Sequence, residues 1–344
     1  MVTYTLKVAD IRKETGDALT LCFKQPALRK IRYRSGQYLT LIVRINGRRY
    51  IRPYSFSSAP STDALIELTI KRVQNGIVSN HIHDTVKIGD AIEVMEPMGE
   101  FTFDGRQDGT GAVYFWGAGS GITPLISLIK DILASNALRA VHLIYGNRNA
   151  ETTIFLDTIN ALLEAYPGRF KAWHFHTQLT MRVENPFVVE GRINRDLVLD
   201  ILKGVDVPDT LHYICGPVGL KESVKEALSL LNVQPSGIFS EDFELIKDPK
   251  DFEDIHTRSI KLRFEAVEYA LEVTKGRSVL EAALDAGLEL PYSCQTGNCS
   301  TCKASRLDGE VRMIGLAKER SDLAVDQYLL CCCYPLTDNV IMEI

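Results

Sequence analysis

The spacing of three cysteines in "PYSCQTGNCSTC" limits what this 344-residue chain can fold into more than any other feature. Cys294, Cys299 and Cys302 follow the pattern C-x4-C-x2-C, and three adjacent cysteines follow at 331–333. A loop that wraps so that three thiolates meet is typical of a plant-type [2Fe–2S] cluster. Gly297 gives this loop backbone freedom to direct N–H groups at sulfur. A structural zinc site, which prefers paired C-x2-C motifs or Cys/His mixtures, is the alternative.

The bulk composition excludes several classes of protein. The chain is 45% hydrophobic and 24% charged, and its length predicts two or three folded domains. A formal charge of -5 and a pI of about 5.9 argue against a nucleic-acid binder. The N-terminus lacks the apolar segment of a signal peptide, and no apolar run is long enough to span a membrane. We therefore expect a cytoplasmic protein, in which clustered cysteines indicate metal binding or catalysis rather than disulfides.

The first hundred residues and the next stretch differ in hydrophobic period. Short strands predict an antiparallel barrel or sandwich in the first part, at 4–11, 18–24, 37–43, 66–73 and 91–96. From residue 111 onward, strands at 111–117, 140–146, 169–175 and 211–216 alternate with helices at 123–135, 152–166 and 219–231. This alternation predicts a parallel sheet with helices on both faces.

A polar, acidic stretch at 245–258 is the best linker candidate. After it, the pattern predicts a hairpin at 260–273, a helix at 278–287 ended by Gly287, and a last strand at 339–344. We therefore divide the chain into domains at 1–107, 108–244 and 258–344, with a linker at 245–257.

Two motifs of the middle domain suit a dinucleotide. "GAGSGITP", from Gly117 to Pro124, follows a strand and opens a helix, so its glycines let a pyrophosphate approach the backbone and the helix N-terminus. "YGNRN" follows the second strand, where the ribose 2′ position is read. Arg148 in this loop favours NADPH over NADH, and an arginine that only contacts solvent is the alternative.

Taken together, the motifs resemble a known family. "RPYSFSS" (52–58) and "IKRVQNGIVSNHIHD" (70–84) are similar to the two flavin-binding elements of the ferredoxin-NADP reductase superfamily. "YICGP" (213–217) and "FSEDF" (239–243) are similar to its C-G-P motif and its closing E-x-F element. The tail from residue 258, including "CKASRLDGEVRM", resembles a plant-type ferredoxin. The whole chain is thus similar to oxygenase reductases of the phenylacetyl-CoA epoxidase and ketosteroid hydroxylase type.

The resemblance implies the fold and the residues of the sites. The expected fold is an antiparallel β-barrel for the flavin, an α/β parallel sheet for the nicotinamide, and a β-grasp α+β ferredoxin domain. Binding of two phosphates favours FAD over FMN. The implied catalytic residues are Ser55 near the flavin N5, Cys215 beside the nicotinamide C4, and Glu241. The implied cofactor-binding residues are Arg52, Pro53, Tyr54, Ser55, Gly76, Val78, Ser79, Gly117, Gly119, Ser120, Gly121, Thr123, Pro124, Arg148, Gly216, Pro217 and Phe243.

The fourth ligand of the cluster must come from "CCCYP" (331–335). Ferredoxins of this type have a pattern like L-x-C-x-x-x-P, so Pro335 selects Cys331. We expect this segment to be extended, with Cys331 and Cys333 on one face and Cys332 on the other. Cys332 and Cys333 are interpreted as buried packing residues, with Cys333 the alternative ligand. The chain departs from the pattern where "DQY" replaces the glycine that usually precedes this cysteine.

The resemblance also implies a function. NAD(P)H would reduce FAD, and electrons would pass through the [2Fe–2S] cluster to an oxygenase or hydroxylase component. The alternatives are the same electron chain serving a desaturase, a P450 or a separate ferredoxin. A different class of alternative is a C-terminal domain that holds a structural metal and only docks partners.

Overall fold

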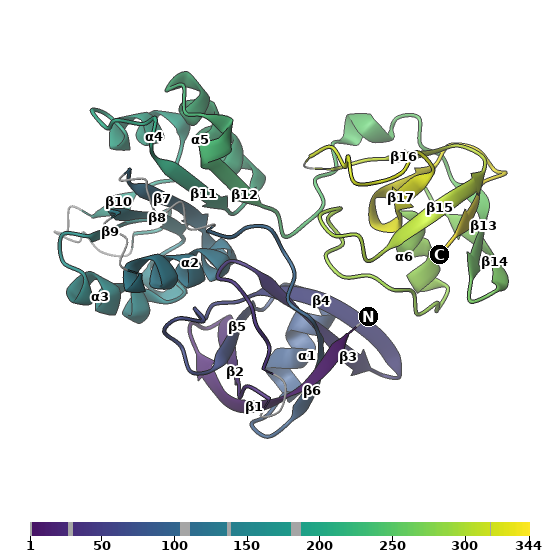
Figure 1. Cartoon of the computed structure of the whole chain (residues 1–344), viewed down its shortest axis with the longest axis horizontal. Coiled ribbons are helices and arrows are strands. Elements are labelled where there is room, and N and C mark those ends of the chain that lie inside the picture. The colour runs from purple at the N-terminus through teal and green to yellow at the C-terminus, as the bar shows by residue number, and fades with distance from the viewer. Residues whose placement is uncertain (1, 27–29, 104–110, 136–138, 180–186, 317) are drawn as a thin grey trace. The chain divides into compact units, whose positions relative to one another are not determined.

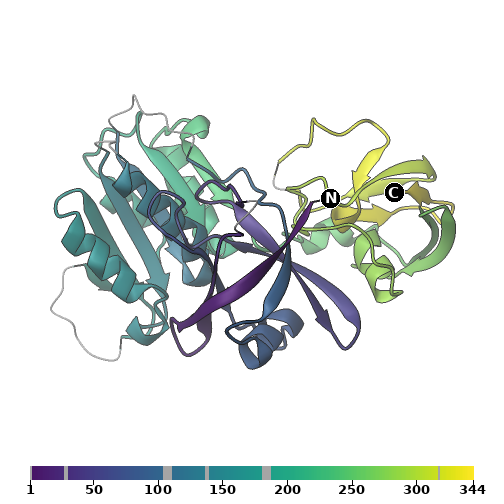
Figure 2. The same cartoon turned by 60° about the horizontal axis from the view of Figure 1, so that its bottom comes forward.

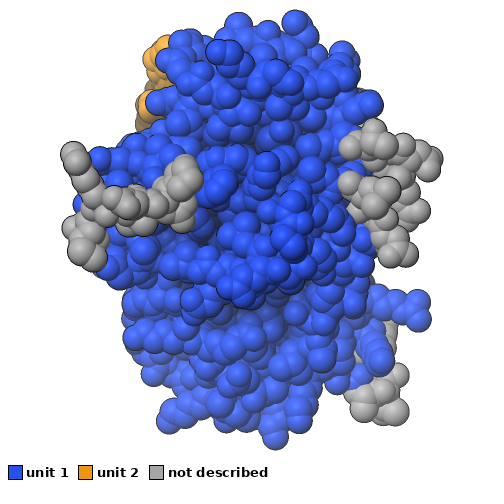
Figure 3. Space-filling model, turned by 90° about the vertical axis from the view of Figure 1, so that its left-hand side faces the viewer, with its two compact units in different colours: residues 1–41, 54–241 blue, residues 42–53, 242–344 orange. Residues whose placement is uncertain are grey.

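The computed structural model describes residues 2–26, 30–103, 111–135, 139–179, 187–316 and 318–344. The chain forms two compact units, residues 1–41 with 54–241 and residues 42–53 with 242–344, which are coloured separately in Figure 3. The predicted boundary between residues 107 and 108 lies outside the described residues. In the part of the chain that the structure describes, no helix is long and apolar enough to cross a membrane.

The N-terminal region forms a six-stranded sheet in the order β4-β3-β6-β1-β2-β5, and its antiparallel pairing is as predicted. Its elements are β1 (Thr3–Lys13), β2 (Ala18–Phe23), β3 (Tyr38–Ile45), β4 (Arg48–Ser55), β5 (Ile66–Lys71), helix α1 (Ile77–Thr85) and β6 (Ala91–Met95). The sequence analysis did not predict β4. Asn46 (φ 51°) and Gly47 (φ 80°) join β3 to β4 in a two-residue turn, because both positions need the left-handed backbone of a tight hairpin.

The middle region is a parallel sheet in the order β10-β9-β8-β7-β11-β12. Its strands are β7 (Val113–Ala118), β8 (Val141–Asn147), β9 (Phe170–His176), β10 (Val188–Glu190), β11 (Leu211–Cys215) and β12 (Ile238–Glu241). Its helices are α2 (Ile122–Ala134), α3 (Leu156–Ala165), α4 (Arg195–Ile201) and α5 (Val218–Leu230). Helices α2 and α3 cover one face and α4 and α5 the other, which confirms the predicted layers (Figure 1; Figure 2).

Alternate residues of the strands form the two cores of this sheet. Val113 and Phe115 on β7 pack under α2 and α3, whereas Tyr114 and Trp116 pack under α4 and α5. Helix α3 begins later than predicted, because Phe155 at its start has a left-handed backbone (φ 62°). The preceding turn is instead a short 3-10 helix, Ala150–Thr152, capped by the side chain of Asn149.

The C-terminal domain contains a mixed five-stranded sheet in the order β14-β13-β19-β15-β17. Its elements are β13 (Arg258–Phe264), β14 (Val267–Val273), α6 (Val279–Asp285), β15 (Lys303–Asp308), β16 (Val311–Met313), β17 (Gln327–Leu329), β18 (Cys333–Pro335) and β19 (Ile341–Glu343). The hairpin β13–β14 and the parallel pairing of β19 with β13 are typical of the expected β-grasp. A capping box between Ser278 and Glu281 starts α6.

The stretch that the sequence predicts as a linker contains packed residues. It includes a 3-10 turn at Pro249–Phe252, and Phe252 and Ile255 are buried against Ile314 and Tyr334. Phe252 meets Tyr334 edge-on, with 5.0 Å between ring centroids. These two apolar side chains attach this part of the stretch to the C-terminal domain.

Candidate active site and cluster loop

The strand order of the parallel sheet reverses between β7 and β11. Strands β8, β9 and β10 lie on one side of β7, and β11 and β12 lie on the other. Open α/β sheets bind ligands at the carboxyl ends of the strands where such a reversal occurs. At this edge Gly117 on β7 is the register partner of Cys215 on β11, which is in turn the partner of Glu241 on β12. The structure therefore brings together three motifs that are far apart in the sequence. We name the place where they meet, at Gly117, Cys215 and Glu241, the strand-end crevice.

The glycines of this edge are required by close packing of the backbone. A Cβ on Gly121 would collide with the carbonyl oxygen of Cys215. A Cβ on Gly216 would lie 2.8 Å from the Leu220 side chain and 3.2 Å from the backbone nitrogen of Ala118. Gly119 has a left-handed backbone, with φ of +53°. Gly121 and Gly216 are therefore required by close packing, whereas Gly119 is favoured by its backbone conformation.

Helix α2 begins directly after these glycines. The 3-10 turn Gly119–Gly121 leads directly into α2, and the N–H of Ile122, the first residue of the helix, donates to the carbonyls of Gly119 and Ser120. The N–H groups without an intrahelical acceptor are therefore those at the start of this turn, which no side chain caps. Such N–H groups and the helix dipole favour a phosphate. Thr123 donates its hydroxyl to the carbonyl of Ser120 at 3.0 Å, and Pro124 is buried in the first turn. Pro217 occupies the N-cap of α5 on the opposite side of the reversal.

Cys215 and Glu241 form a buried pair beside the crevice. Burial raises the pKa of Glu241 to about 8, and its Oε2 atom is buried without a hydrogen-bond partner among the described residues. Burial and the neighbouring Glu241 both raise the pKa of the Cys215 thiol well above its usual value. Both groups therefore hold their protons at neutral pH, which leaves two uncharged proton donors at the strand ends.

The predicted flavin residues lie on β4 and at the start of α1. Ser55, at the end of β4, is buried, and Arg52 donates from Nη1 to the carbonyl of Ile51 at 2.8 Å. Gly76 is the N-cap of α1, and a Cβ there would lie 2.7 Å from the hydroxyl oxygen of Ser79.

The other residues of α1 and β4 are placed as follows. The Ser79 hydroxyl accepts the N–H of Val73 at 3.1 Å, so it orders the turn before the helix. Val78 is buried, and Pro53 and Tyr54 follow Arg52 directly along β4.

Two further predicted residues, and one residue that was not predicted, are placed as follows. Arg148 follows β8 and is exposed, and its Nη2 lies 3.5 Å from a carboxylate oxygen of Asp17. Phe243 is exposed in the second compact unit. The sequence analysis missed Tyr145, whose buried hydroxyl donates to the carbonyl of Gly119 at 2.8 Å. Its signal was a tyrosine at the end of a buried strand, beside the glycine motif.

The four predicted cluster ligands form one thiol network. The Sγ of Cys294 accepts the backbone N–H of Thr296 at 3.4 Å and that of Cys299 at 3.3 Å. It also accepts the thiols of Cys299 and Cys331, which lowers the pKa of Cys294 and raises the pKa of both donors. The Cys331 thiol interacts with Cys302 as well and lowers the pKa of Cys302. N–H groups that point at sulfur stabilise a thiolate, as a cluster ligand requires.

The run 331–333 differs from the expectation. The prediction of an extended segment is correct for Cys333–Pro335, which form β18, but wrong for the residues before it, because Leu330–Cys332 form a 3-10 turn. The turn brings the Sγ of Cys332 within 3.4 Å of that of Cys331, whereas the Sγ of Cys333 lies 3.8 Å from the Sδ of Met342. Cys332, rather than Cys333, is therefore the neighbour of the predicted ligand. Gly297 has φ of +76°, and a Cβ there would lie 2.8 Å from the Cys332 sulfur.

The chemistry of these donors fits a two-iron cluster. Four thiolates shared between two irons need not converge on a single point. Among the described residues, no three Cys, His, Asp or Glu side chains are placed to hold a single metal ion. All eight cysteines are free, so none of the four predicted ligands is consumed by a disulfide.

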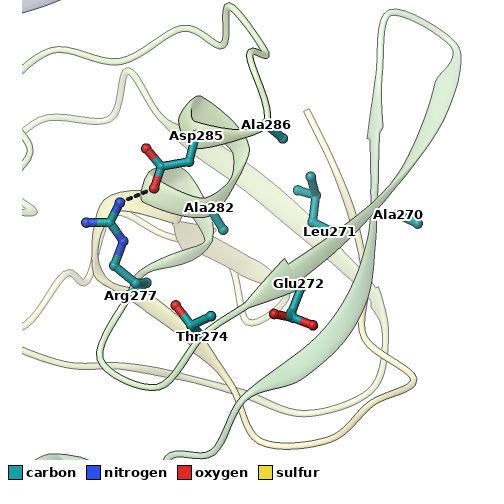
Figure 4. A pocket seen from close by; sticks show the side chains of 8 residues that line it. All are labelled: Ala270, Leu271, Glu272, Thr274, Arg277, Ala282, Asp285 and Ala286. Atoms are coloured by element: carbon teal, nitrogen blue, oxygen red, sulfur yellow. Dashed lines mark hydrogen bonds and ion pairs between the residues drawn. The ribbon is translucent and has the colours of Figure 1, made fainter.

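A pocket of about 290 Å³ lies on the C-terminal domain between α6 and β14 (Figure 4). The carboxylate of Asp285 and the guanidinium of Arg277 form an ion pair at its edge. The remaining side chains that line it include Leu271, Glu272 and Ala282. None of the predicted site residues is among its lining residues, so the pocket is separate from the cluster loop.

Comparison with known proteins identifies three domain families in this order along the chain. Residues 5–103 match an oxidoreductase FAD-binding domain, residues 115–226 an oxidoreductase NAD-binding domain, and residues 263–336 a 2Fe-2S iron-sulfur cluster binding domain. FAD, NAD(P)H and a [2Fe–2S] cluster are therefore the cofactors of this chain. The match of the third domain also decides between the cluster and a structural zinc site, in favour of the cluster.

Relatives match the chain along nearly its full length. The chain is 30% identical to one component of the 1,2-phenylacetyl-CoA epoxidase of Escherichia coli, over 99% of this chain and 97% of the relative. It is 29% identical to the ferredoxin reductase component of 3-ketosteroid-9-alpha-monooxygenase of Rhodococcus rhodochrous, over 98% and 96%. The solved structure of phthalate dioxygenase reductase superposes with a TM-score of 0.70 at 23% identity, over 99% and 98%, and shows the same fold.

Proposed function

Because the chain belongs to the family of three-domain oxygenase reductases, we propose that it delivers electrons from NAD(P)H to an oxygenase or hydroxylase component. The chain is an NAD(P)H-dependent oxidoreductase. One observation carries the proposal: a strand-end crevice for a dinucleotide and a loop of four interacting thiols occur in the same chain. When bound, FAD accepts two electrons as a hydride and releases them singly, as a [2Fe–2S] cluster requires.

The strand-end crevice positions the nicotinamide nucleotide. Gly117, Gly121 and Gly216 open the backbone to a pyrophosphate, and the start of the 3-10 turn Gly119–Gly121, which leads into α2, offers its N–H groups. Cys215 and Glu241 place two uncharged groups where the reacting ring would lie, because burial keeps both protonated. Glu241 thus holds a proton at Oε2 without adding a negative charge.

The flavin motif holds the second cofactor in this proposal. Arg52 supplies the cation for a flavin phosphate and Tyr54 a flat face for the ring. The buried hydroxyl of Ser55 is the hydrogen-bonding group proposed for the flavin N5. Gly76, Val78 and Ser79 at the start of α1 are proposed to receive the second phosphate, which favours FAD.

The loop 294–302 and Cys331 are proposed as the cluster ligands. Separate substitutions Cys331→Ser, Cys332→Ser and Cys333→Ser test the assignment by iron and acid-labile sulfide content. We expect Cys331→Ser to lose the cluster and Cys333→Ser to keep it. Cys332→Ser is the sharper control, because its sulfur lies 3.4 Å from that of Cys331. Retention of a full cluster in Cys331→Ser would disprove the assignment.

The proposal as a whole is tested with the purified protein. Anaerobic addition of NAD(P)H should bleach both the flavin and the iron–sulfur absorption, and reconstitution with a candidate oxygenase should then support substrate hydroxylation. Absence of either chromophore, or failure of NAD(P)H to bleach them, would contradict it. The names of the relatives support an oxygenase as the acceptor.

The nucleotide preference and the location complete the proposal. Arg148 is proposed to favour NADPH, although Asp17 already pairs with it. Arg148→Ala should therefore raise the KM for NADPH more than the KM for NADH, and an equal effect on both would contradict this role. The free cysteines support a cytoplasmic location, which fractionation of cells would test.

A further inference from the structure

Arg320 uses every donor of its guanidinium group next to the cluster loop. It lies in the segment between β16 and β17, outside all the motifs described above. Its Nη1 donates to the carbonyls of Gly297 and Cys299, the second at 3.3 Å. Its Nη2 donates to the Ser300 hydroxyl at 2.7 Å and to Asp322 at 2.8 Å, and its Nε donates to Asp322 at 2.7 Å. Five N–H groups thus meet five acceptors, the full capacity of an arginine.

The carbonyls that accept from Arg320 belong to a part of the loop with an unfavourable backbone conformation. Gln295 (φ 59°) and Gly297 (φ 76°) both have left-handed backbones, and for Gln295 this conformation is unfavourable. The same loop directs the N–H groups of Thr296 and Cys299 to the Cys294 sulfur. The carbonyls of Gly297 and Cys299, which Arg320 fixes on either side of Asn298, therefore hold the backbone from which the predicted ligand Cys299 extends.

An ordinary surface ion pair does not account for this arrangement. The Arg320 side chain is only 7% exposed, whereas that of its partner Asp322 is 56% exposed. Three of its five hydrogen bonds go to the loop rather than to the carboxylate. Exposed ion pairs contribute little to the free energy of unfolding. A buried arginine whose donors all have acceptors instead fixes the position of the groups that it contacts.

We propose that Arg320 is a positioning residue for the [2Fe–2S] cluster, which fixes the loop at 297–300 and places a positive charge that raises the reduction potential of the cluster. This rests on the ligand assignment proposed above. Reduction adds one electron to the cluster, so a buried cation nearby stabilises the reduced form. The charge of Asp322 opposes this effect only partly, because solvent screens an exposed carboxylate.

Three substitutions in the full-length protein separate the two roles. Arg320→Gln removes the charge and most of the hydrogen bonds. Arg320→Lys keeps the charge but loses the planar fork. Asp322→Asn keeps the arginine and removes the opposing charge. Arg306→Gln is the matched control, because Arg306 is a half-buried arginine of the same domain that donates to the carbonyl of Gly309.

Two measurements apply to each variant: the midpoint potential of the cluster by EPR-monitored redox titration, and the rate of iron loss to a chelator. We expect Arg320→Gln to lower the potential and to weaken iron retention about 10- to 100-fold, the range for residues that support metal ligands. Arg320→Lys should keep the potential near that of the wild type but lose iron faster. Asp322→Asn should raise the potential, and Arg306→Gln should change neither quantity.

The outcomes that overturn the proposal are distinct from failure of the proposed function. If Arg320→Gln and Arg306→Gln have equal potentials and equal iron loss, Arg320 has no positioning role. If Arg320→Gln takes up no cluster, Asp322→Asn decides, and an unchanged potential there overturns the charge effect. Reduction of the flavin by NAD(P)H should proceed at the wild-type rate in every variant. Absence of iron and sulfide from the wild-type protein would instead refute the ligand assignment itself.

Discussion

The strand-end crevice and the cluster loop both use backbone groups to hold a polar cofactor in the proposed function, but the two regions position that backbone by different means. In the crevice, the backbone packs closely because glycine has no side chain, and a Cβ at Gly121 would collide with the Cys215 carbonyl. In the loop, function depends on a side chain that arrives from elsewhere, because Arg320 donates to the Cys299 carbonyl from 21 residues later. A site built from glycines is visible in a local motif, whereas a site held by a distant arginine is not.

The largest effect is expected in the crevice, from Gly121→Ala. The strand end has no room for a Cβ beside Cys215, so this substitution should cost about 3 kcal/mol in the free energy of unfolding. Displacement of the strand ends by about 1 Å should slow flavin reduction by NAD(P)H roughly 100-fold. Stopped-flow absorbance and urea denaturation measure the two quantities. Gly219→Ala on α5 is the control, since a Cβ there would meet nothing within 4 Å; equal behaviour of the two variants would refute the packing argument.

Acid should weaken the sheet that carries the crevice. Burial lowers the pKa of His142 and His174 to about 4 and that of His212 to about 3. The unfolded chain takes up these protons near pH 6.5. Above that pH the buried neutral histidines therefore cost no stability, and the free energy of unfolding falls as the pH drops towards 4. We expect each of the three histidines to contribute a loss of about 2 kcal/mol between pH 7 and pH 5.

Tryptophan fluorescence during urea denaturation measures this loss selectively. The chain has two tryptophans, Trp116 on β7 and Trp173 on β9, so both lie in the parallel sheet. The substitution His142→Gln should reduce the pH dependence, and an unchanged dependence would contradict the role of burial. The only histidine after residue 212 is His256, so no comparable set of histidines exists in the cluster domain.

A smaller effect is expected in the cluster loop from Gly297→Ala. The left-handed backbone alone should cost about 1–2 kcal/mol, and the new Cβ would also press on the Cys332 sulfur. The ratio of iron to protein and the urea stability of the visible absorption should both fall. Adding Cys332→Ala should restore part of the loss by removing that sulfur. No restoration would contradict the role of the Cys332 sulfur and would leave the Leu316 side chain, 2.5 Å from the new Cβ, as the main obstacle.

The smallest effect concerns the charge of the crevice. The folded chain keeps the proton of Glu241 up to about pH 8, whereas the unfolded chain releases it near pH 4.5. Glu241 therefore contributes stability at low pH that is lost as the pH rises towards 8. Relative to wild type, Glu241→Gln should gain about 1 kcal/mol between pH 7 and pH 8 in urea denaturation. Glu164→Gln, an exposed glutamate on α3, should show no such trend, and the same trend in both variants would contradict burial as the cause.

The hydrophobic periodicity of the sequence predicted the fold class of the three domains but not every helix and strand. Strand β4 was missed because "RRYIRPYS" is rich in charge, and its best signal was the Asn46–Gly47 turn before it. The predicted helix at 152–166 begins at Leu156, because Asn149 caps a separate turn there. Such local competition between a cap and a helix is decided by hydrogen bonds that periodicity does not describe.

The residues of the candidate sites also fall into those that the motifs predicted and those that they did not. The glycines of the crevice and the four predicted thiols are found together where the motifs imply. Cys332 and Cys333 are both buried, as predicted, but the 3-10 turn places the sulfur of Cys332, rather than that of Cys333, next to Cys331. Arg320 had no signal at all, since nothing near it in the sequence distinguishes it from a solvated arginine.

The position of β19 has a consequence for how the cluster domain is made. This strand, Ile341–Glu343, lies between β13 and β15 in the middle of the sheet, although it is the last strand along the chain. The hairpin β13–β14 is held by local pairing, whereas β19 joins it to β15. Because such non-local pairing forms late, we expect this sheet to close in one of the last steps in the folding of the cluster domain, after every predicted ligand has been synthesised.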